Sequence, residues 1–175
     1  MDFTTDHFSL FELPPAFRID AALLDGRYLE MQSRVHPDRF ASAGEADRRL
    51  SLQWATRVNE AYQTLKNPLS RARYLLQLAA HDVGSENNAA MPADFLVEQM
   101  AWREAVAEAR AAREHHELEH LHHRLQREIR ERHDELAVLL DDRRDFEQAA
   151  DRVRRLMFIE KLLIEIDDAM VACEE

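Results

Sequence analysis

Apolar side chains recur at helical spacing in two stretches of the N-terminal half, which predicts a pair of packed helices. Within 20–35, the apolar positions are Leu24, Tyr28, Met31 and Val35. Within about 50–65, they are Trp54, Val58, Ala61 and Leu65. Intervals of three and four residues place each set on one face of an α-helix. Asp20 is suited to cap the first helix, because its carboxylate can accept from free N–H groups of the first turn. We expect the two helices to lie antiparallel with these faces in contact.

A rigid corner, Val35-His36-Pro37-Asp38-Arg39-Phe40, separates the two helices. The helical period stops at His36 because proline disfavours the helical conformation of the residue before it. Pro37 also has no N–H with which to continue a helix. The corner therefore presents an imidazole and a carboxylate two positions apart. Apolar segments over 8–13 and 69–80 predict further short helices on either side of the pair.

The second half of the chain is helix-patterned and is predicted to form a separate three-helix bundle. Residues 81–92 are rich in Gly, Ser, Asn and Pro without an apolar period, so we interpret them as a linker. A single helix over 93–175 would exceed the ordinary length in a globular protein. Turns are therefore expected near 113–117 and 141–145. The predicted fold is all-α, with an N-terminal domain over 1–80, the linker over 81–92 and a C-terminal domain over 93–175.

Two helices of the C-terminal half carry apolar residues outside their core faces. In the helix that starts near 93, the core face is Phe95, Trp102, Val106 and Ala109. A different face holds Leu96, Val97 and Met100, extended by Glu104 and Glu108. In the last helix, the core face is Ala149, Val153, Leu156, Leu163 and Met170. Phe158 is predicted to point away from that face, among charged side chains. Such a second apolar surface favours a protein-binding site; the alternative is a wider bundle that buries both faces.

Charge and composition narrow the classes of partner. The net charge is −11, and residues 1–80 hold equal numbers of acidic and basic side chains, so the excess acid lies in 81–175. An acidic surface repels nucleic-acid phosphates and suits a basic partner; the alternative is a charged face that serves solubility alone. Cys173 is the only cysteine, which excludes an internal disulfide and a cysteine-ligated cluster. We find no apolar run long enough to span a membrane and no secretory signal pattern, and expect a cytoplasmic protein.

Two constellations suggest chemistry of the chain's own. His116 and His120 stand four residues apart on a predicted helix, near His123, and this spacing suits a shared metal ion. The alternative, which we favour, is a solvated polar face. His36 and Asp38 have the residue types of an acid–base pair, but no nucleophile or oxyanion donors accompany them. No phosphate-binding glycine loop is present, so ATP chemistry would belong to a partner. We expect neither enzymatic activity nor a metal or cofactor.

Several motifs resemble known proteins in the same order along the chain. The helix–corner–helix arrangement around His36-Pro37-Asp38 resembles the J domain, with which co-chaperones stimulate ATP hydrolysis by DnaK-type chaperones. Motifs similar to the HscB co-chaperone family of iron–sulfur cluster assembly are His7-Phe8-Ser9-Leu10-Phe11-Glu12-Leu13-Pro14, Asn59-Glu60-Ala61-Tyr62-Gln63-Thr64-Leu65-Lys66-Asn67-Pro68-Leu69, Arg71-Ala72-Arg73-Tyr74-Leu75-Leu76, Phe95-Leu96-Val97-Glu98-Gln99-Met100 and Val153-Arg154-Arg155-Leu156-Met157-Phe158. The resemblance covers nearly the whole chain.

This resemblance implies two partners, each with its own surface. The N-terminal domain is expected to stimulate the ATPase of HscA, a DnaK-type chaperone, through His36, Pro37, Asp38, Arg39, Arg27 and Arg34. The C-terminal domain is expected to hold the iron–sulfur scaffold protein IscU through Leu96, Val97, Met100, Glu104, Glu108 and Phe158. The alternatives are a general J-domain co-chaperone with a different client and, less favoured, a metal-binding helical protein.

Overall fold

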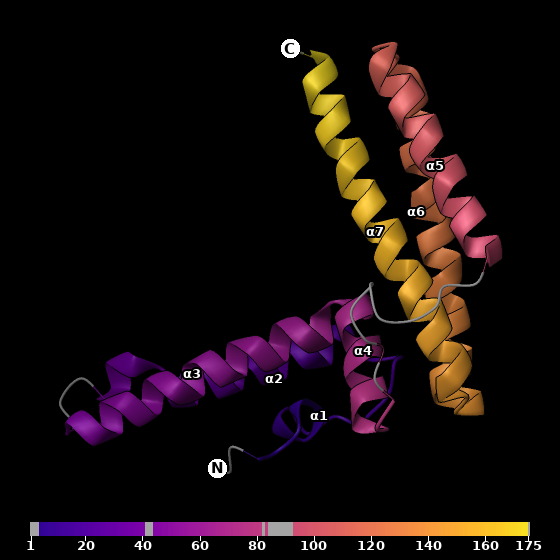
Figure 1. The fold of residues 1–175 in the computed structure, drawn as a ribbon. Helices are drawn as coiled ribbons and strands as arrows, with labels where there is room; N and C mark the ends of the chain where they lie inside the picture. Colours follow the sequence, from indigo (N-terminus) through magenta and orange to yellow (C-terminus); the bar gives the residue numbers. More distant parts are fainter. Residues whose placement is uncertain (1–3, 41–43, 82, 84–92, 175) are drawn as a thin grey trace. The chain divides into compact units, whose positions relative to one another are not determined.

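The computed structural model describes residues 4–40, 44–81, 83 and 93–174, and every regular element within them is helical. The chain divides into two compact units, Met1–Leu78 and Ala79–Glu175. The prediction of an all-α fold is confirmed (Figure 1). Among the described helices, none combines the length and the apolar character needed to cross a membrane.

The N-terminal unit is built around an antiparallel helical hairpin. Its helices are α1 (His7–Leu10), α2 (Ala21–Val35), α3 (Glu45–Lys66) and α4 (Pro68–Leu78), and the short 3-10 turn η1 (Pro37–Phe40) follows α2. Helices α2 and α3 lie side by side in Figure 1 and pack directly on one another. Asp20 caps α2, since its carboxylate accepts from the N–H groups of Ala22 and Leu23. Helix α3 begins about five residues before the start near 50 that the sequence predicted. Its first turns are exposed, so they have no apolar period by which the sequence could mark them.

The core of this unit contains the two stripes that the sequence predicts. Leu24, Met31 and Val35 of α2 are buried, with Tyr28 packed at their edge. The four positions of α3, Trp54, Val58, Ala61 and Leu65, are all buried, and Phe8, Phe11 and Leu13 from the α1 region complete the core. At one side of the hairpin the rings of Tyr28 and Tyr62 stack with centroids 4.0 Å apart. Near them, Lys66 lies 3.0 Å from Asp25, and its hydrogen bond lowers the pKa of that carboxyl.

The C-terminal unit is a three-helix bundle of α5 (Ala93–Ala111), α6 (His115–Ala137) and α7 (Phe146–Glu174), with a π-helical segment η2 (Val138–Arg143) at the end of α6. All three helices pack pairwise. Both predicted turns are present. They pass through Arg113 and Arg144, which adopt the left-handed conformation with φ of 54° and 53°, respectively. Asp145 then caps α7, since its carboxylate accepts from the N–H of Gln148 at 3.1 Å.

The boundary between the units falls next to the predicted linker. Residues 82 and 84–92 lie outside the described residues, so a linker over 81–92 stays a prediction. Its two described members belong to the C-terminal unit. Val83 is buried, and the His81 ring lies 5.4 Å from that of Phe146 at the start of α7.

Candidate functional site

The corner after α2 presents two polar side chains to solvent. The His36 side chain is 51% exposed and that of Asp38 is 90% exposed. The backbone N–H of Asp38 donates to Nδ1 of His36 at 3.3 Å, and Oδ2 of Asp38 lies 3.6 Å from the same nitrogen. Nδ1 thus accepts from the backbone and has the carboxylate of Asp38 close beside it. The pair is thus held in a defined arrangement while remaining open to a partner.

Two side chains from outside the tripeptide fix the end of α2. Ser51 of α3 is buried, and its hydroxyl donates to the carbonyl of Val35 at 2.8 Å. Arg39 donates to the carbonyl of Ser33 at 3.1 Å, and its own N–H bonds the carbonyl of His36. These donors satisfy carbonyls that a helix C-terminus leaves without intrahelical partners. The role of Ser51 was not predicted from the sequence. A polar residue three positions before Trp54 on the apolar face was the available signal, because buried hydroxyls need a bonding partner.

The three predicted basic residues differ in their surroundings. Arg34 lies exposed in the last turn of α2, and Arg39 lies exposed in η1. Arg27 is two turns earlier and is paired with Glu12 at 3.1 Å and Glu30 at 3.4 Å. Arg34 and Arg39 are therefore the more available charges beside the corner, since the two carboxylates offset much of the field of Arg27.

The C-terminal unit carries the second predicted surface on α5. Leu96, Val97 and Met100 are all exposed, and so are Glu104 and Glu108. Four of these five recur every fourth residue, a spacing that lines side chains along one side of a helix. On the opposite side, Phe95, Val106 and Ala109 are buried and Trp102 packs against the same core. The two-faced interpretation of α5 is confirmed, and we name Leu96, Val97 and Met100 the apolar surface of α5.

Phe158 does not belong to that surface, so its predicted outward direction is wrong. Its side chain is 5% exposed and lies in the bundle core, with its ring edge-on to that of Phe95 at 5.7 Å between centroids. The guanidinium of Arg103 lies over the same ring at 5.4 Å. The cause is the packing of α7 against both α5 and α6, which buries a wider arc of the helix than one stripe. The alternative of a wider bundle therefore holds for α7 but not for α5.

The histidine-rich start of α6 is engaged with carboxylates. His120 lies 3.7 Å from Glu117 and His115 lies 3.8 Å from Glu119, both on the same helix. His122 reaches across to Asp167 of α7 at 3.1 Å. In the part of the chain that the structure describes, no three His, Cys, Asp or Glu side chains gather closely enough to hold a metal ion. The cluster thus contributes polar contacts within and between helices.

The hairpin with an exposed histidine and carboxylate after its first helix has the arrangement that resembles a J domain. In the same chain it is followed by a three-helix bundle with an apolar surface, as expected of a co-chaperone with a client-binding domain. Comparison with known proteins gives the particular family. Residues 91–167 match the family model described as the HSCB C-terminal oligomerisation domain. A "Co-chaperone protein HscB homolog" of Aromatoleum aromaticum is 56% identical over 174 residues, covering 99% of this chain and 98% of that protein.

Solved structures agree with the sequence relatives. Chaperone HscB from Vibrio cholerae superposes with a TM-score of 0.82 at 36% identity, covering 94% of this chain and 96% of that one. The human co-chaperone protein HscB superposes with a TM-score of 0.89 at 30% identity, covering 95% of this chain and 83% of that one. The chain belongs to the HscB co-chaperone family.

Proposed function

We propose that this protein stimulates ATP hydrolysis by a DnaK-type chaperone, HscA, and delivers the iron–sulfur scaffold protein IscU to it in the cytoplasm. The observation that carries this proposal is the pair of separate exposed surfaces, one on each unit. His36 and Asp38 stand open at the end of the α2–α3 hairpin. The apolar surface of α5 stands open on the bundle. A protein with two such surfaces can hold a chaperone and its client at once.

The chaperone surface offers both shape and charge. The corner is fixed by Ser51 and by the backbone of η1, so it needs little ordering when a partner docks. Arg34 and Arg39 add positive charge beside it. Such charges favour an acidic patch on the chaperone and speed the encounter.

The client surface has the character of an interface. Leu96, Val97 and Met100 provide an apolar centre, and Glu104 and Glu108 continue it as an acidic strip. Interfaces commonly combine a desolvated apolar core with a polar rim. The client is therefore expected to present an apolar patch beside basic side chains. Phe158 supports this surface from beneath, through Phe95, rather than touching the client.

Stimulation of the HscA ATPase and binding of IscU should be coupled, because one molecule carries both surfaces. ATP hydrolysis by HscA would be measured with IscU alone, with this protein alone and with both. Holding client and chaperone on one molecule raises their effective concentration, so the rate with both should exceed the sum of the separate increases. A rate increase that ignores IscU would favour a general co-chaperone with a different client. A rate that stays basal in all three mixtures would overturn the proposal.

A further inference from the structure

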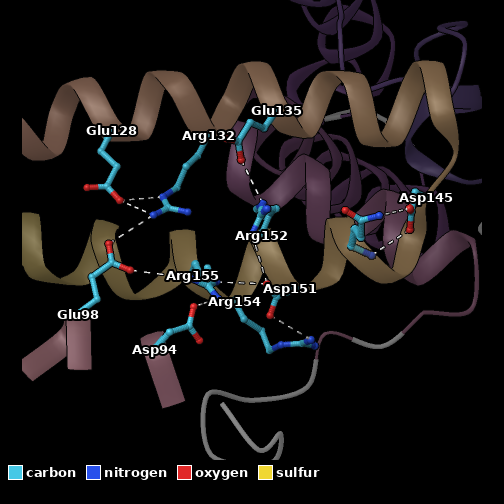
Figure 2. A network of polar contacts seen from close by, with 11 residues as sticks. Asp94, Glu98, Glu128, Arg132, Glu135, Asp145, Asp151, Arg152, Arg154 and Arg155 are labelled. Carbon is cyan, nitrogen blue, oxygen red and sulfur yellow. Dashed lines mark hydrogen bonds and ion pairs between the residues drawn. The ribbon is translucent and has the colours of Figure 1, made fainter. Parts of the chain in front are cut away.

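Two arginines from different helices converge on the first turns of α5. Arg155 of α7 lies 3.3 Å from Asp94 and 3.8 Å from Glu98, and Arg132 of α6 lies 3.7 Å from Glu98. In Figure 2, dashed lines join Glu98 to both guanidinium groups, and Asp94 lies below Arg155. One side of α5 is thereby joined to both other helices by charged contacts.

Both arginines are largely withdrawn from solvent and are held in place by further carboxylates. Their side chains are 13% exposed for Arg155 and 14% exposed for Arg132. Arg155 also bonds Asp151 at 3.2 Å, and Arg132 bonds Glu128 on its own helix (Figure 2). A guanidinium with two or three carboxylate partners has little freedom to turn, because its planar fork fixes the direction of each donor. These arginines are therefore stiff supports for the groups they bind on α5.

The aromatic core strengthens the same junction. The Arg155 guanidinium lies over the ring of Phe95 at 4.8 Å, and Phe95 in turn meets Phe158. The hydrogen bond from Arg155 also holds the pKa of the Asp94 carboxyl below its ordinary value, so this partner is ionised at neutral pH. Asp94, Phe95 and Glu98 thus each contact the same arginine, and all three lie in the first two turns of α5.

The apolar surface of α5 occupies the same two turns of helix. Leu96 and Val97 lie between Asp94 and Glu98 in the sequence, and Met100 follows two residues later. Any tilt or fraying of these turns would move all three side chains together. A client that meets a surface already in its bound arrangement loses less conformational freedom on binding.

We propose that Arg155, assisted by Arg132, is a positioning residue for client binding: it holds the start of α5 so that Leu96, Val97 and Met100 face the client in a fixed arrangement. This role rests on the proposed function, since it presumes that the client docks on α5. Arg155 acts through Asp94, Phe95 and Glu98 and makes no contact with the client itself.

A neighbouring arginine offers a matched control. Arg152 stands one turn earlier on α7 and pairs with Glu135 of α6 at 3.1 Å and with Asp151 at 3.6 Å. Neither partner belongs to α5, as Figure 2 shows. Arg155→Gln and Arg152→Gln therefore remove the same charge from the same helix, and only the first releases α5.

The experiment compares these two full-length variants with the unaltered protein by titration with IscU and by amide hydrogen exchange. Arg155→Gln should weaken IscU binding roughly threefold to tenfold, the cost of ordering one or two extra side chains on binding. It should also speed exchange of the amides of 95–100 more than that of amides in the middle of α6. Arg152→Gln should leave both quantities as they are in the unaltered protein.

The outcomes separate the two claims. Normal IscU affinity in Arg155→Gln would overturn the positioning role and leave the proposed function standing. Equal weakening by Arg152→Gln would also overturn it, because general destabilisation would then explain both. If the unaltered protein fails to bind IscU, the proposed function fails and the positioning role fails with it. Should Arg155→Gln not fold, Asp94→Asn takes its place, since it removes one α5 partner and leaves no unpaired guanidinium; unchanged affinity there would count against the role in the same way.

Discussion

The ring of Phe158 meets the ring of Phe95 edge to face, with centroids 5.7 Å apart and planes at 88°. This contact joins α7 to α5 directly beneath the turns that carry Leu96 and Val97. Edge-to-face pairs add a specific attraction to the burial of two large side chains. Phe158 is consequently a core residue of the bundle, and its influence on the client surface passes through α5.

Replacing Phe158 by alanine should therefore destabilise the protein. Removal of a buried phenylalanine costs about 3–5 kcal/mol, because apolar contact is lost and a cavity remains. A urea melt of Phe158→Ala measures this loss. The matched control is Leu23→Ala, a half-exposed position on α2 in the other unit, for which a much smaller loss is expected. A loss below about 0.5 kcal/mol for Phe158→Ala, as at a surface site, would contradict the core assignment.

Shortening side chains of the apolar surface of α5 should weaken client binding and leave the stability of the protein nearly unchanged. Val97 is 68% exposed on α5 and Val171 is 61% exposed on α7, so the same substitution to alanine at each forms a matched pair. Both changes should leave the free energy of unfolding within about 0.5 kcal/mol. Only Val97→Ala should weaken IscU binding, and Met100→Ala should weaken it further, by about 1–3 kcal/mol for an interface anchor. Equal IscU affinity in Met100→Ala and the unaltered protein would remove α5 from the client site.

Local patterns in the sequence predicted the hairpin well, and the reasons are physical. The spacing of Leu24, Met31 and Val35 matches one face of a helix, and each is buried as that spacing requires. Asn67 ends α3 just before Pro68, where the α conformation is disfavoured. Such features depend on neighbours within a turn or two, so the chain itself specifies them.

Features that depend on distant partners were not predictable in the same way. Phe158 lies about 160° around α7 from Leu156, given the 100° advance per residue, yet both are buried. Phe158 is buried because α5 and α6 cover different arcs of α7. A single apolar stripe in the sequence does not predict two such arcs. The contact of Arg155 with Asp94 spans 61 positions of sequence. In the sequence, charged residues at those positions look like part of a solvated helix face. Only the packing of the bundle shows that they contact one another.

Ser51 provides a test of how the His36 corner is held. Ser51→Ala removes the donor to the Val35 carbonyl, and loss of a buried hydrogen bond should cost about 1–3 kcal/mol of stability. The amide resonances of Asp38 and Arg39 should shift in a ¹H–¹⁵N spectrum, since they follow the end of α2. Thr56→Ala is the control, because the Thr56 hydroxyl bonds Leu52 within α3 and is exposed. Unmoved Asp38 and Arg39 resonances in Ser51→Ala would show that Ser51 does not hold the corner.

Salt should reveal the part played by the basic residues. If Arg34 and Arg39 face an acidic surface, half-maximal stimulation of HscA should need more of this protein as salt rises, because exposed charges are screened beyond about 8 Å at physiological ionic strength. Arg34→Gln should weaken stimulation and flatten that dependence. Arg73→Gln, an exposed arginine on α4, should do neither. A flat response of the unaltered protein to salt would rule out this electrostatic contribution.

If the exposed corner drives ATP hydrolysis by the chaperone, its two polar side chains should be needed for the increase in the HscA rate. The rate would be measured with saturating amounts of the unaltered protein, His36→Gln and Asp38→Asn. Both side chains are exposed, so each variant should keep its melting temperature and its affinity for IscU. Neither variant should raise the rate above that of HscA alone, while the unaltered protein should. Full stimulation by either variant, folded and bound to IscU, would contradict this role of the corner.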